Sequence, residues 1–473
     1  MLFNSFVFFV FLAVVLPIFY CLPTKTSKNV FLLIASYVFY GYWDWRFCAL
    51  LILSTIIDFY IGLKIHNART AQLSKRYFLV SLITNLGILG VFKYFNFFIE
   101  SFQALSEKFG WQLDMLHLNV ILPVGISFYT FQTLSYSIDV YRKKLKPADN
   151  IIDFALFVSI FPQLVAGPIE RASDLLPQLT VKLKPSIEQI KQGVVLIVMG
   201  LFRKVIIGDS AGRYVDNIFS NMAHYSSYEL IFGLVMFSIQ IYADFSGYSH
   251  IARGTAKMLG VELMKNFEQP YLSQNITEFW RRWHISLSTW LKDYLYIALG
   301  GNRKGTISTY VNIIITMLLG GLWHGASWNF VIWGGLHGIY LSVHKMMLKG
   351  EKIPERITKL NLSTVLKVFL TYCLVLFTWL FFRSTSWDMT TLYFSKIYYW
   401  EKTEHATILT VVMISFVSIT LLLDYFEYVT KKHTFLLNIK SWGVKVGILL
   451  ALFIVSIAYM FQSEPLPFIY FQF

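Results

Sequence analysis

The chain has 473 residues, of which 56% are hydrophobic and only 14% are charged. Soluble domains carry about 25% charged residues, so this composition excludes a series of ordinary soluble domains. The net charge of +14 does not indicate nucleic-acid binding. Lys and Arg gather instead in alternate loops between apolar stretches, as they do in cytoplasmic loops of membrane proteins.

Apolar runs of about 15–22 residues recur along the chain, each near the length needed to cross a hydrocarbon core of about 30 Å. The expected spans are 3–22, 29–43, 47–63, 77–98, 120–140, 192–208, 230–248, 310–324, 329–344, 366–383, 407–424 and 443–461. The first run lacks a basic leader and a cleavage site, so we expect it to be a retained span. We predict an all-α polytopic membrane protein with about 11–13 transmembrane helices and one membrane-embedded domain, 1–473.

Charge places the loops on the two sides of the membrane. The basic loop Lys64–Arg76 and the basic run Arg142–Lys146 are expected in the cytoplasm, and the acidic loop Glu100–Asp114 outside. Segment 151–168 is apolar, has basic residues on both sides and contains "FPQLVAGP", which is typical of a re-entrant element. With these assignments both chain ends are expected outside the cytoplasm.

The stretch "GGLWHGASWNF", Gly320–Phe330, places a histidine deep in an apolar hairpin formed by 310–324 and 329–344. An ionisable residue in a membrane span is a candidate functional residue, although a helix–helix hydrogen bond would also explain His324. Small residues and Trp323 surround it. A neutral imidazole in an apolar tunnel could act as a general base. His337, on the second arm of the hairpin, is expected only to form a hydrogen bond within the helix bundle.

A second cluster lies in "EFWRRWHISLSTWLKDYLY", within the amphipathic segment 250–306 that we expect on the cytoplasmic side. Helical spacing would put Trp283, Leu287, Trp290, Tyr294 and Ile297 on one face and the charged residues elsewhere. The segment could be an interfacial helix whose basic residues bind anionic lipid. Alternatively, the cations Arg281, Arg282, Lys292, Arg303 and Lys304 could hold an anionic cytoplasmic cosubstrate, with His284 as a second catalytic group.

A third candidate is "YADFSGYS", Tyr242–Ser249, where Asp244 is expected at the end of an apolar span beside Ser246. It could be a helix-end charge or the polar floor of a cavity. His433 is expected in a loop or at the interface. The sequence has no HExxH motif, no Cys–His set and no Walker or nucleophile-elbow motif, so we predict no metal site. Cys21, Cys48 and Cys373 have no metal or disulfide spacing.

Together with "LPVGISFYTFQTLSYSIDVYR" (122–142), "FPQLVAGPIER" (161–171) and "ITEFWRRWHISLSTWLKDYLYIALGGNR" (276–303), these stretches resemble the membrane-bound O-acyltransferases. Within that family they resemble the bacterial alginate O-acetylation subgroup, and the resemblance covers essentially the whole chain. It implies a ring of helices around a funnel or tunnel and acyl transfer from a cytoplasmic thioester to a hydroxyl. The family's signature histidine corresponds to His324 and its second polar residue to His284. His250 departs from the subgroup, which has an acidic residue after "FSGYS".

The carboxy-terminal tail, 462–473, ends in "FIYFQF". It resembles the end of small partner peptides in the related D-alanylation systems through Phe468, Tyr470 and Phe473, which makes Tyr470 a candidate acyl relay. Glu464 stands where a further Phe is expected. An aromatic membrane anchor would also explain these residues.

The sequence therefore predicts an O-acetyltransferase of the bacterial inner membrane that uses acetyl-CoA as cosubstrate and no bound cofactor. By resemblance, an esterase-like extracytoplasmic partner would pass the acetyl group to a polysaccharide, such as an alginate-like exopolysaccharide. Peptidoglycan O-acetylation is the first alternative, and teichoic acid D-alanylation or secondary transport are more distant ones. The predicted catalytic residues are His324 and His284. The predicted substrate- or cosubstrate-binding residues are Arg281, Arg282, Trp283, Lys292, Asp293, Trp323, Asp244, Ser246 and Gln163.

Overall fold

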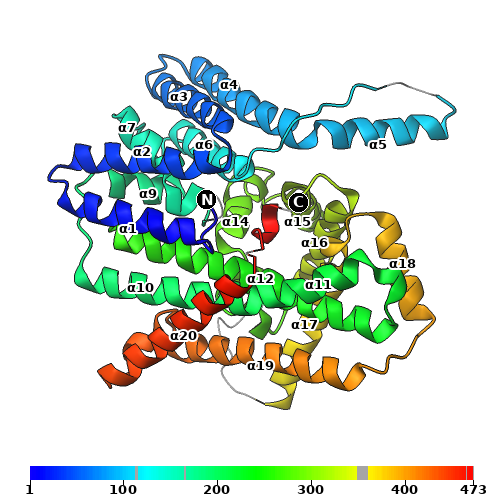
Figure 1. Ribbon diagram of the computed structural model, residues 1–473. Helices are drawn as coiled ribbons and strands as arrows, with labels where there is room; N and C mark the ends of the chain where they lie inside the picture. The colour runs from blue at the N-terminus through cyan, green and yellow to red at the C-terminus, as the bar shows by residue number, and fades with distance from the viewer. Residues whose placement is uncertain (112–114, 165–166, 349–360, 465, 472–473) are drawn as a thin grey trace. The chain divides into compact units, whose positions relative to one another are not determined.

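The computed structural model describes residues 1–111, 115–164, 167–348, 361–464 and 466–471. All regular secondary structure in these residues is helical, and loops and turns connect the helices (Figure 1). Asp114 and Phe473, named above, lie outside the described residues. Two compact units emerge from the packing: Met1–Gly193 with Thr255–Met264, and Val194–Gly254 with Lys265–Phe473. Whether the chain acts as the single domain expected from the sequence stays a prediction.

Seven helices in the described part of the chain are long and apolar enough to cross a membrane. They are Arg46–His66, Ala71–Lys108, Ser227–Met258, Thr306–His324, Leu362–Arg383, Ala406–Thr430 and Trp442–Gln462. Each of the twelve predicted spans overlaps helical residues, although 120–140 begins six residues before its helix and 77–98 and 192–208 each run through a π-helix. The polytopic membrane class is confirmed, while the larger number of crossings and the ring around a funnel remain predictions.

In its described residues the first unit contains nine α-helices, the start of a tenth, and the π-helix η1 Gly90–Tyr94, which joins α4 to α5 in the long helix Ala71–Lys108. The α-helices are α1 Phe6–Cys21, α2 Lys25–Asp44, α3 Arg46–His66, α4 Ala71–Leu89, α5 Phe95–Lys108, α6 Ile126–Tyr141, α7 Ile151–Ser159, α8 Phe161–Leu164, α9 Ala172–Leu179 and α10 Ile187–Leu201. A buried polar network joins α3, α4 and α6. The Asp58 carboxylate accepts hydrogen bonds from Ser81 Oγ (2.6 Å), Asn85 Nδ2 (2.8 Å) and Ser137 Oγ (3.3 Å). Interhelical polar contacts of this kind hold apolar helices in one register.

In its described residues the predicted re-entrant segment contains two short helices, α7 and α8, separated by the non-helical residue Ile160 (φ −54°, ψ 119°). Apart from the first residues of α7, both helices are buried. The backbone N–H of Phe161, at the start of α8, donates to Ser36 Oγ at 3.0 Å, and Gln132 Nε2 donates to the carbonyl of Phe157. Side chains from neighbouring helices thus satisfy the backbone where the helix breaks, which is the condition for irregular backbone at membrane depth.

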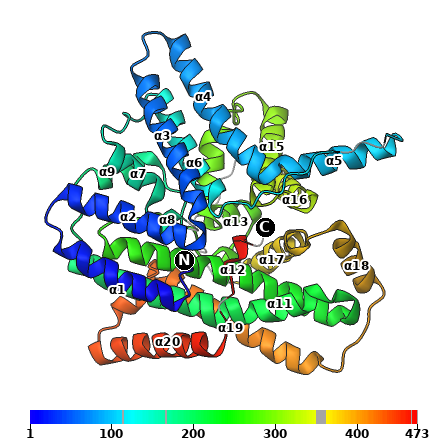
Figure 2. The same cartoon turned by 45° about the horizontal axis from the view of Figure 1, so that its top comes forward.

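The second unit carries the remaining helices of the described residues. They are the π-helices η2 Phe202–Asp209 and η5 Leu291–Tyr296, the α-helices α11 Ser210–Ser220, α12 Ser227–Met258, α13 Ile276–Arg282, α14 Ile285–Trp290, α15 Thr306–His324, α16 Trp328–Leu348, α17 Leu362–Arg383, α18 Trp387–Tyr398, α19 Ala406–Thr430 and α20 Trp442–Gln462, and the 3₁₀ turns η3 Met222–His224, η4 Pro270–Leu272, η6 Phe435–Asn438 and η7 Ile469–Phe471. After α20 the tail turns back and lies beside α12, as Figures 1 and 2 both show.

Glycines let the backbone of η2 approach that of α12. A Cβ atom on Gly247 would lie 2.7 Å from the amide nitrogen of Lys204, and one on Gly208 would lie 3.0 Å from the amide nitrogen of Asp244. Such separations leave no room for a larger residue, so the two helices pack backbone to backbone at these positions. The consequence is that Lys204 and Asp244 face each other.

Candidate active site

The predicted hairpin carrying His324 is present, since α15 and α16 pack along each other through glycine. A Cβ atom on Gly321 would overlap the carbonyl of Phe330, and one on Gly334 would overlap that of Met317. The small residues around His324 therefore serve close packing of backbone in this structure. His324 is the last residue of α15, and Gly325 continues the chain in an extended conformation.

His284 lies at a break between α13 and α14, so the prediction of one continuous amphipathic helix was wrong. Its backbone has φ 42° and ψ 56°, the left-handed region that costs a non-glycine residue roughly 1–2 kcal/mol. The following residues are fixed by Asn266, whose carbonyl accepts from Ile285 N (2.9 Å) and whose Oδ1 accepts from Ser286 Oγ (2.6 Å). The break turns the His284 side chain inward, where it is completely buried.

Three predicted residues from separate segments meet in the second unit. The ring of His324 lies 5.4 Å from that of Tyr470 and 6.3 Å from that of His284, and the rings of His284 and Tyr470 are 6.3 Å apart. Aromatic rings form the walls around them. Trp333 and Trp323 each lie 5.0 Å from His324, and Phe245 lies 4.7 Å from both His284 and Tyr470.

Polar atoms of this cluster are buried without hydrogen-bond partners among the described residues. They are the two ring nitrogens of His284 and the hydroxyl of Tyr470. Leaving a buried donor or acceptor unsatisfied costs about 1–3 kcal/mol, and native proteins rarely do so without a functional reason. The arrangement is therefore suited to groups that a bound substrate would supply.

Burial also sets the protonation of the two groups. Burial lowers the pKa of His284 to about 3, so its imidazole is neutral at physiological pH. Burial, and next the charge of Asp244, raise the pKa of the Tyr470 hydroxyl above its ordinary value, so the phenol keeps its proton unless a base removes it. A neutral imidazole beside a protonated hydroxyl is the arrangement needed for general-base chemistry.

The predicted cationic residues have different surroundings. Arg281, Lys292, Arg303 and Lys304 are exposed. Arg282 is buried in an ion pair with Glu278 (2.6 Å) and donates to the carbonyl of Glu268 (3.2 Å). Asp293 is half-buried, whereas Trp283 is fully buried and stacks on Phe279 with ring centroids 5.5 Å apart.

Asp244 is in the middle of α12, so its expected position at a helix end was wrong. The helix continues to Met258 because its later polar residues have buried partners. His250 Nε2, for example, lies 3.0 Å from His433 Nδ1. His433 lies in the turn after α19, as one of its two expected positions had it, and its ring is buried. Ser246 is buried in α12, and Gln163 is buried in α8 of the first unit.

Sequence reasoning missed two buried cations on η2. Arg203 pairs with Asp424 (3.1 Å) and Glu427 (3.0 Å), while Lys204 pairs with Asp209 (2.6 Å) and Asp244 (2.8 Å). The signal was available, because two adjacent cations inside the apolar run 192–208 require buried partners. His337 has the predicted structural contacts: it accepts from Trp280 Nε1 at 3.2 Å and lies 3.0 Å from Thr378 Oγ1.

Comparison with known proteins agrees with the resemblance found in the motifs. Residues 142–387 match the MBOAT, membrane-bound O-acyltransferase family. The Probable alginate O-acetylase AlgI of Azotobacter vinelandii is 42% identical over 391 residues, which are 82% of this chain and 76% of that protein. The Peptidoglycan O-acetyltransferase of Helicobacter pylori is 35% identical over 415 residues, covering 81% of this chain and 77% of that protein.

A more distant relative is the Teichoic acid D-alanyltransferase of Bacillus subtilis, 27% identical over 271 residues that are 55% of this chain and 68% of that protein. The chain therefore belongs to the membrane-bound O-acyltransferase family. It is a multi-pass membrane enzyme that transfers an acyl group to oxygen.

Proposed function

We propose that this enzyme transfers acetyl groups from cytoplasmic acetyl-CoA, across the bacterial inner membrane, to an extracytoplasmic cell-surface polysaccharide. The observation that carries the proposal is the meeting of His324, His284 and the tail residue Tyr470 inside one aromatic cluster. A thioester, a hydroxyl and a base must come together where water is scarce, because water competes with the acceptor hydroxyl.

His324 acts as the general base in this proposal. Its imidazole takes the proton of the attacking hydroxyl, and the hydroxyl oxygen bonds to the acetyl carbonyl carbon. The C–S bond then breaks, and the leaving thiolate takes the proton to give CoA. Neutral His284, buried with both ring nitrogens unpartnered among the described residues, is suited to bind the thioester carbonyl or assist proton transfer.

Tyr470 supplies the first acceptor hydroxyl. Its phenol lies against His324, and acetylation would store the acetyl group as a tyrosyl ester on the tail. A second hydroxyl, from a partner protein or from the polysaccharide, would then attack the ester and regenerate the phenol. This two-step path would allow donor and acceptor to approach from opposite sides of the membrane.

The exposed cations around α14 suit the acyl donor. Arg281, Lys292, Arg303 and Lys304 are exposed, and CoA carries several phosphate charges. This placement supports a cytoplasmic position for the segment, with both termini outside as the loop charges predict. Anionic lipid headgroups could bind the same residues.

The acceptor is proposed from the relatives. AlgI proteins are named alginate O-acetylases, which favours an alginate-like exopolysaccharide reached through an esterase-like extracytoplasmic partner. Peptidoglycan is the second candidate, because the Helicobacter pylori relative is a peptidoglycan O-acetyltransferase and covers a similar share of the chain.

The decisive experiment uses purified protein in lipid nanodiscs with acetyl-CoA carrying a labelled acetyl group. Wild type, His324→Ala and Tyr470→Phe are compared for CoA release and for label on the protein by peptide mass spectrometry. His337→Gln is a matched control, because His337 is buried in the same unit but is hydrogen-bonded.

We expect CoA release to fall at least about a hundredfold in His324→Ala, which is the lower range for loss of a general base. Label is expected on Tyr470 in wild type and absent from Tyr470→Phe. CoA release that survives in folded His324→Ala would overturn the catalytic assignment. Release that needs His324 while Tyr470 stays unlabelled would replace the relay with direct transfer to a partner.

A further inference from the structure

We propose that a buried ion pair, Lys204–Asp244, grips the backbone of the carboxy-terminal tail and positions Tyr470 at His324. The inference rests on the proposed function for its catalytic meaning, although the grip itself is a statement about binding. We call Lys204, Asp209 and Asp244 the tail clamp. All three are buried, and they come from η2 and α12.

The first observation is the coordination of the Lys204 ammonium, which has three protons to donate. Its Nζ lies 2.6 Å from Asp209 Oδ1, 2.8 Å from Asp244 Oδ1 and 3.2 Å from the carbonyl oxygen of Leu466. The tail therefore supplies the third acceptor. Without the tail, a buried ammonium proton would lose its partner, at a cost larger than that of a neutral group.

The second observation is the contact made by the other carboxylate oxygen of Asp244. While Oδ1 faces Lys204, Oδ2 accepts a hydrogen bond from the backbone N–H of Ile469 at 2.8 Å. One ion pair thus binds a carbonyl and an amide of the same short segment, on either side of Pro467. Because both contacts are with backbone atoms, they fix the path of the chain rather than the identity of side chains.

The clamp determines where the next residue lies. Consecutive Cα atoms are about 3.8 Å apart, so a fixed amide at Ile469 leaves Tyr470 little freedom. Aromatic packing fixes the rest, since Phe468 stacks on Tyr470 at 5.3 Å and packs on Tyr248 at 4.6 Å. The phenol reaches the histidines as a result.

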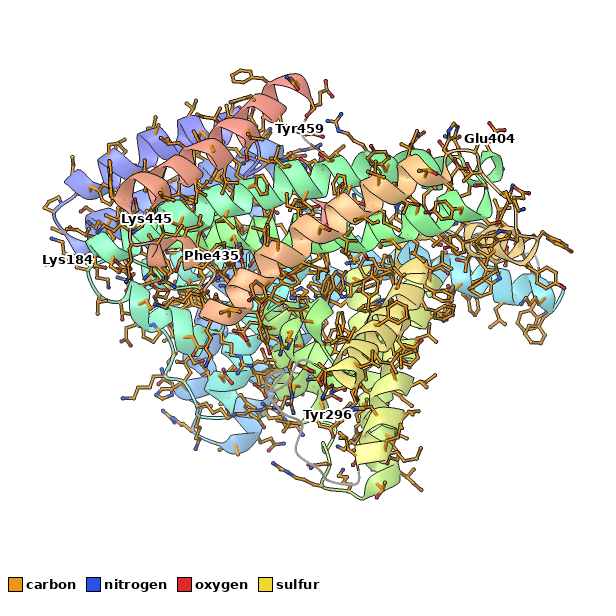
Figure 3. All side chains as sticks on the ribbon, turned by 90° about the horizontal axis from the view of Figure 1, so that it is seen from below. Lys184, Tyr296, Glu404, Phe435, Lys445 and Tyr459 are labelled. Atoms are coloured by element: carbon orange, nitrogen blue, oxygen red, sulfur yellow. The ribbon has the colours of Figure 1, made fainter. Side chains whose placement is uncertain are left out.

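The start of the tail is also held. Arg213 on α11 donates to the carbonyl of Glu464 (3.2 Å), and Ser210 Oγ donates to the hydroxyl of Tyr459 (2.8 Å), which Figure 3 labels near the end of α20. These contacts bring the tail to the clamp but leave its last residues unconstrained. The clamp is therefore the contact that determines register.

The test uses the full-length protein in nanodiscs and measures the tail directly. A carboxypeptidase that also cleaves at proline removes residues from the chain end, and mass spectrometry follows how fast digestion passes residue 469. Two variants weaken the clamp from opposite sides: Asp244→Asn removes the acceptor charge, and Ile469→Pro removes the donor N–H but leaves every clamp side chain in place. Controls are Ile469→Val, which keeps the N–H, and Asp424→Asn, a buried carboxylate whose described partners are Arg203 and Tyr242.

We expect digestion past Ile469 to be at least about tenfold faster in Asp244→Asn and Ile469→Pro, since loss of a charge-assisted hydrogen bond raises the undocked population by that order. Both controls should digest like wild type. In the labelled acetyl-CoA assay, the clamp variants should keep the KM for acetyl-CoA while label on Tyr470 falls at least about tenfold. Lys204→Arg should retain part of the protection because it keeps the charge.

Digestion in folded Ile469→Pro at the wild-type rate would overturn the clamp, whatever the acetyl assay gives. Because this variant changes only the tail, its result is readable even if Asp244→Asn fails to fold. Protection that depends on the clamp in a protein that never labels Tyr470 would uphold the clamp and reject the relay. Equal loss of label in Asp424→Asn and Asp244→Asn, with equal protection, would make the ion pair merely structural.

Discussion

The ring of Tyr470, in the carboxy-terminal tail, lies 5.4 Å from the ring of His324, the last residue of α15. The phenol hydroxyl is buried and has no hydrogen-bond partner among the described residues. A hydroxyl kept for membrane anchoring would lie at the lipid headgroups, where water and polar groups are available. Its burial beside an imidazole instead favours a chemical use.

The first prediction separates these two uses through Tyr470→Phe. Removing an unpartnered buried hydroxyl relieves a desolvation cost, so the melting temperature should stay the same or rise. Transfer of label to an acceptor should nevertheless fall at least about a hundredfold. Tyr129→Phe is the control, because the Tyr129 hydroxyl is also buried without a described partner. It should keep transfer, and a similar loss there would indicate a general packing effect.

The second prediction concerns His337, which belongs to the same unit as His324 but contacts Trp280 and Thr378. His337→Gln should lower the free energy of unfolding by about 1–3 kcal/mol, because buried partners lose their hydrogen bonds. Its His324-dependent CoA release should stay within about threefold of wild type, because the hydrogen bonds of His337 are with Trp280 and Thr378 rather than with His324. Thermal unfolding and CoA release are measured on the same preparation. A large loss of release with unchanged stability would move His337 into the catalytic machinery.

Local sequence patterns were sufficient for the helices and for the hairpin of α15 and α16, and they marked His284 and His324 as candidates, whereas Tyr470 became a candidate through the resemblance of the tail. Hydropathy identifies a span from its own residues, and each of those three residues lies in a stretch that departs from a plain apolar pattern. Their meeting in one cluster was not predicted and comes from the structure, because no local pattern states which distant segments approach each other.

Three features needed the tertiary structure. The helix break at His284 depends on Asn266 holding the following backbone, while the helical spacing of aromatic residues runs straight through the break. Asp244 could be interior to a helix only because Lys204 neutralises it. The backbone contacts of the tail involve a carbonyl and an amide, and such groups leave no trace in residue types.

The third prediction is a pH dependence of stability due to His284, which lies outside the seven apolar helices. Its folded pKa of about 3 is below the unfolded value of about 6.5, so the unfolded chain binds one more proton between these values. Stability from neutral His284 is therefore complete above pH 6.5 and declines as pH falls. From pH 7.5 to 5.0 the group should cost about 2 kcal/mol, at 1.36 kcal/mol per unit below 6.5.

His284→Gln should remove this part of the acid sensitivity. The measurement is equilibrium unfolding in mixed detergent at pH 7.5 and 5.0, comparing the change between the two values in wild type and variant. His405→Gln is the control, because His405 is exposed, and its replacement should leave the pH response of the wild type unchanged. An identical pH response in wild type and His284→Gln would mean that His284 is accessible to protons in the folded protein.

The fourth prediction is that two neighbouring arginines, Arg281 and Arg282, have different roles. Arg282 forms a buried ion pair with Glu278, and removing one partner of such a pair costs about 3–5 kcal/mol. Arg282→Ala should therefore unfold at markedly lower temperature. Arg281 is exposed, so Arg281→Ala should leave the melting temperature unchanged and raise the KM for acetyl-CoA about two- to fivefold, as expected for one exposed ionic contact.

Salt gives an independent check on Arg281, because exposed charge contacts are screened at high ionic strength. The KM of wild type should rise between low salt and 0.5 M NaCl, and the ratio of KM values for Arg281→Ala and wild type should shrink toward one. Replacing anionic lipid in the nanodisc by neutral lipid tests whether Arg281 binds lipid headgroups instead of acetyl-CoA. If Arg281→Ala changes the response to lipid charge but leaves the KM for acetyl-CoA unchanged at every salt concentration, the exposed cations bind the membrane surface and the acyl donor enters elsewhere.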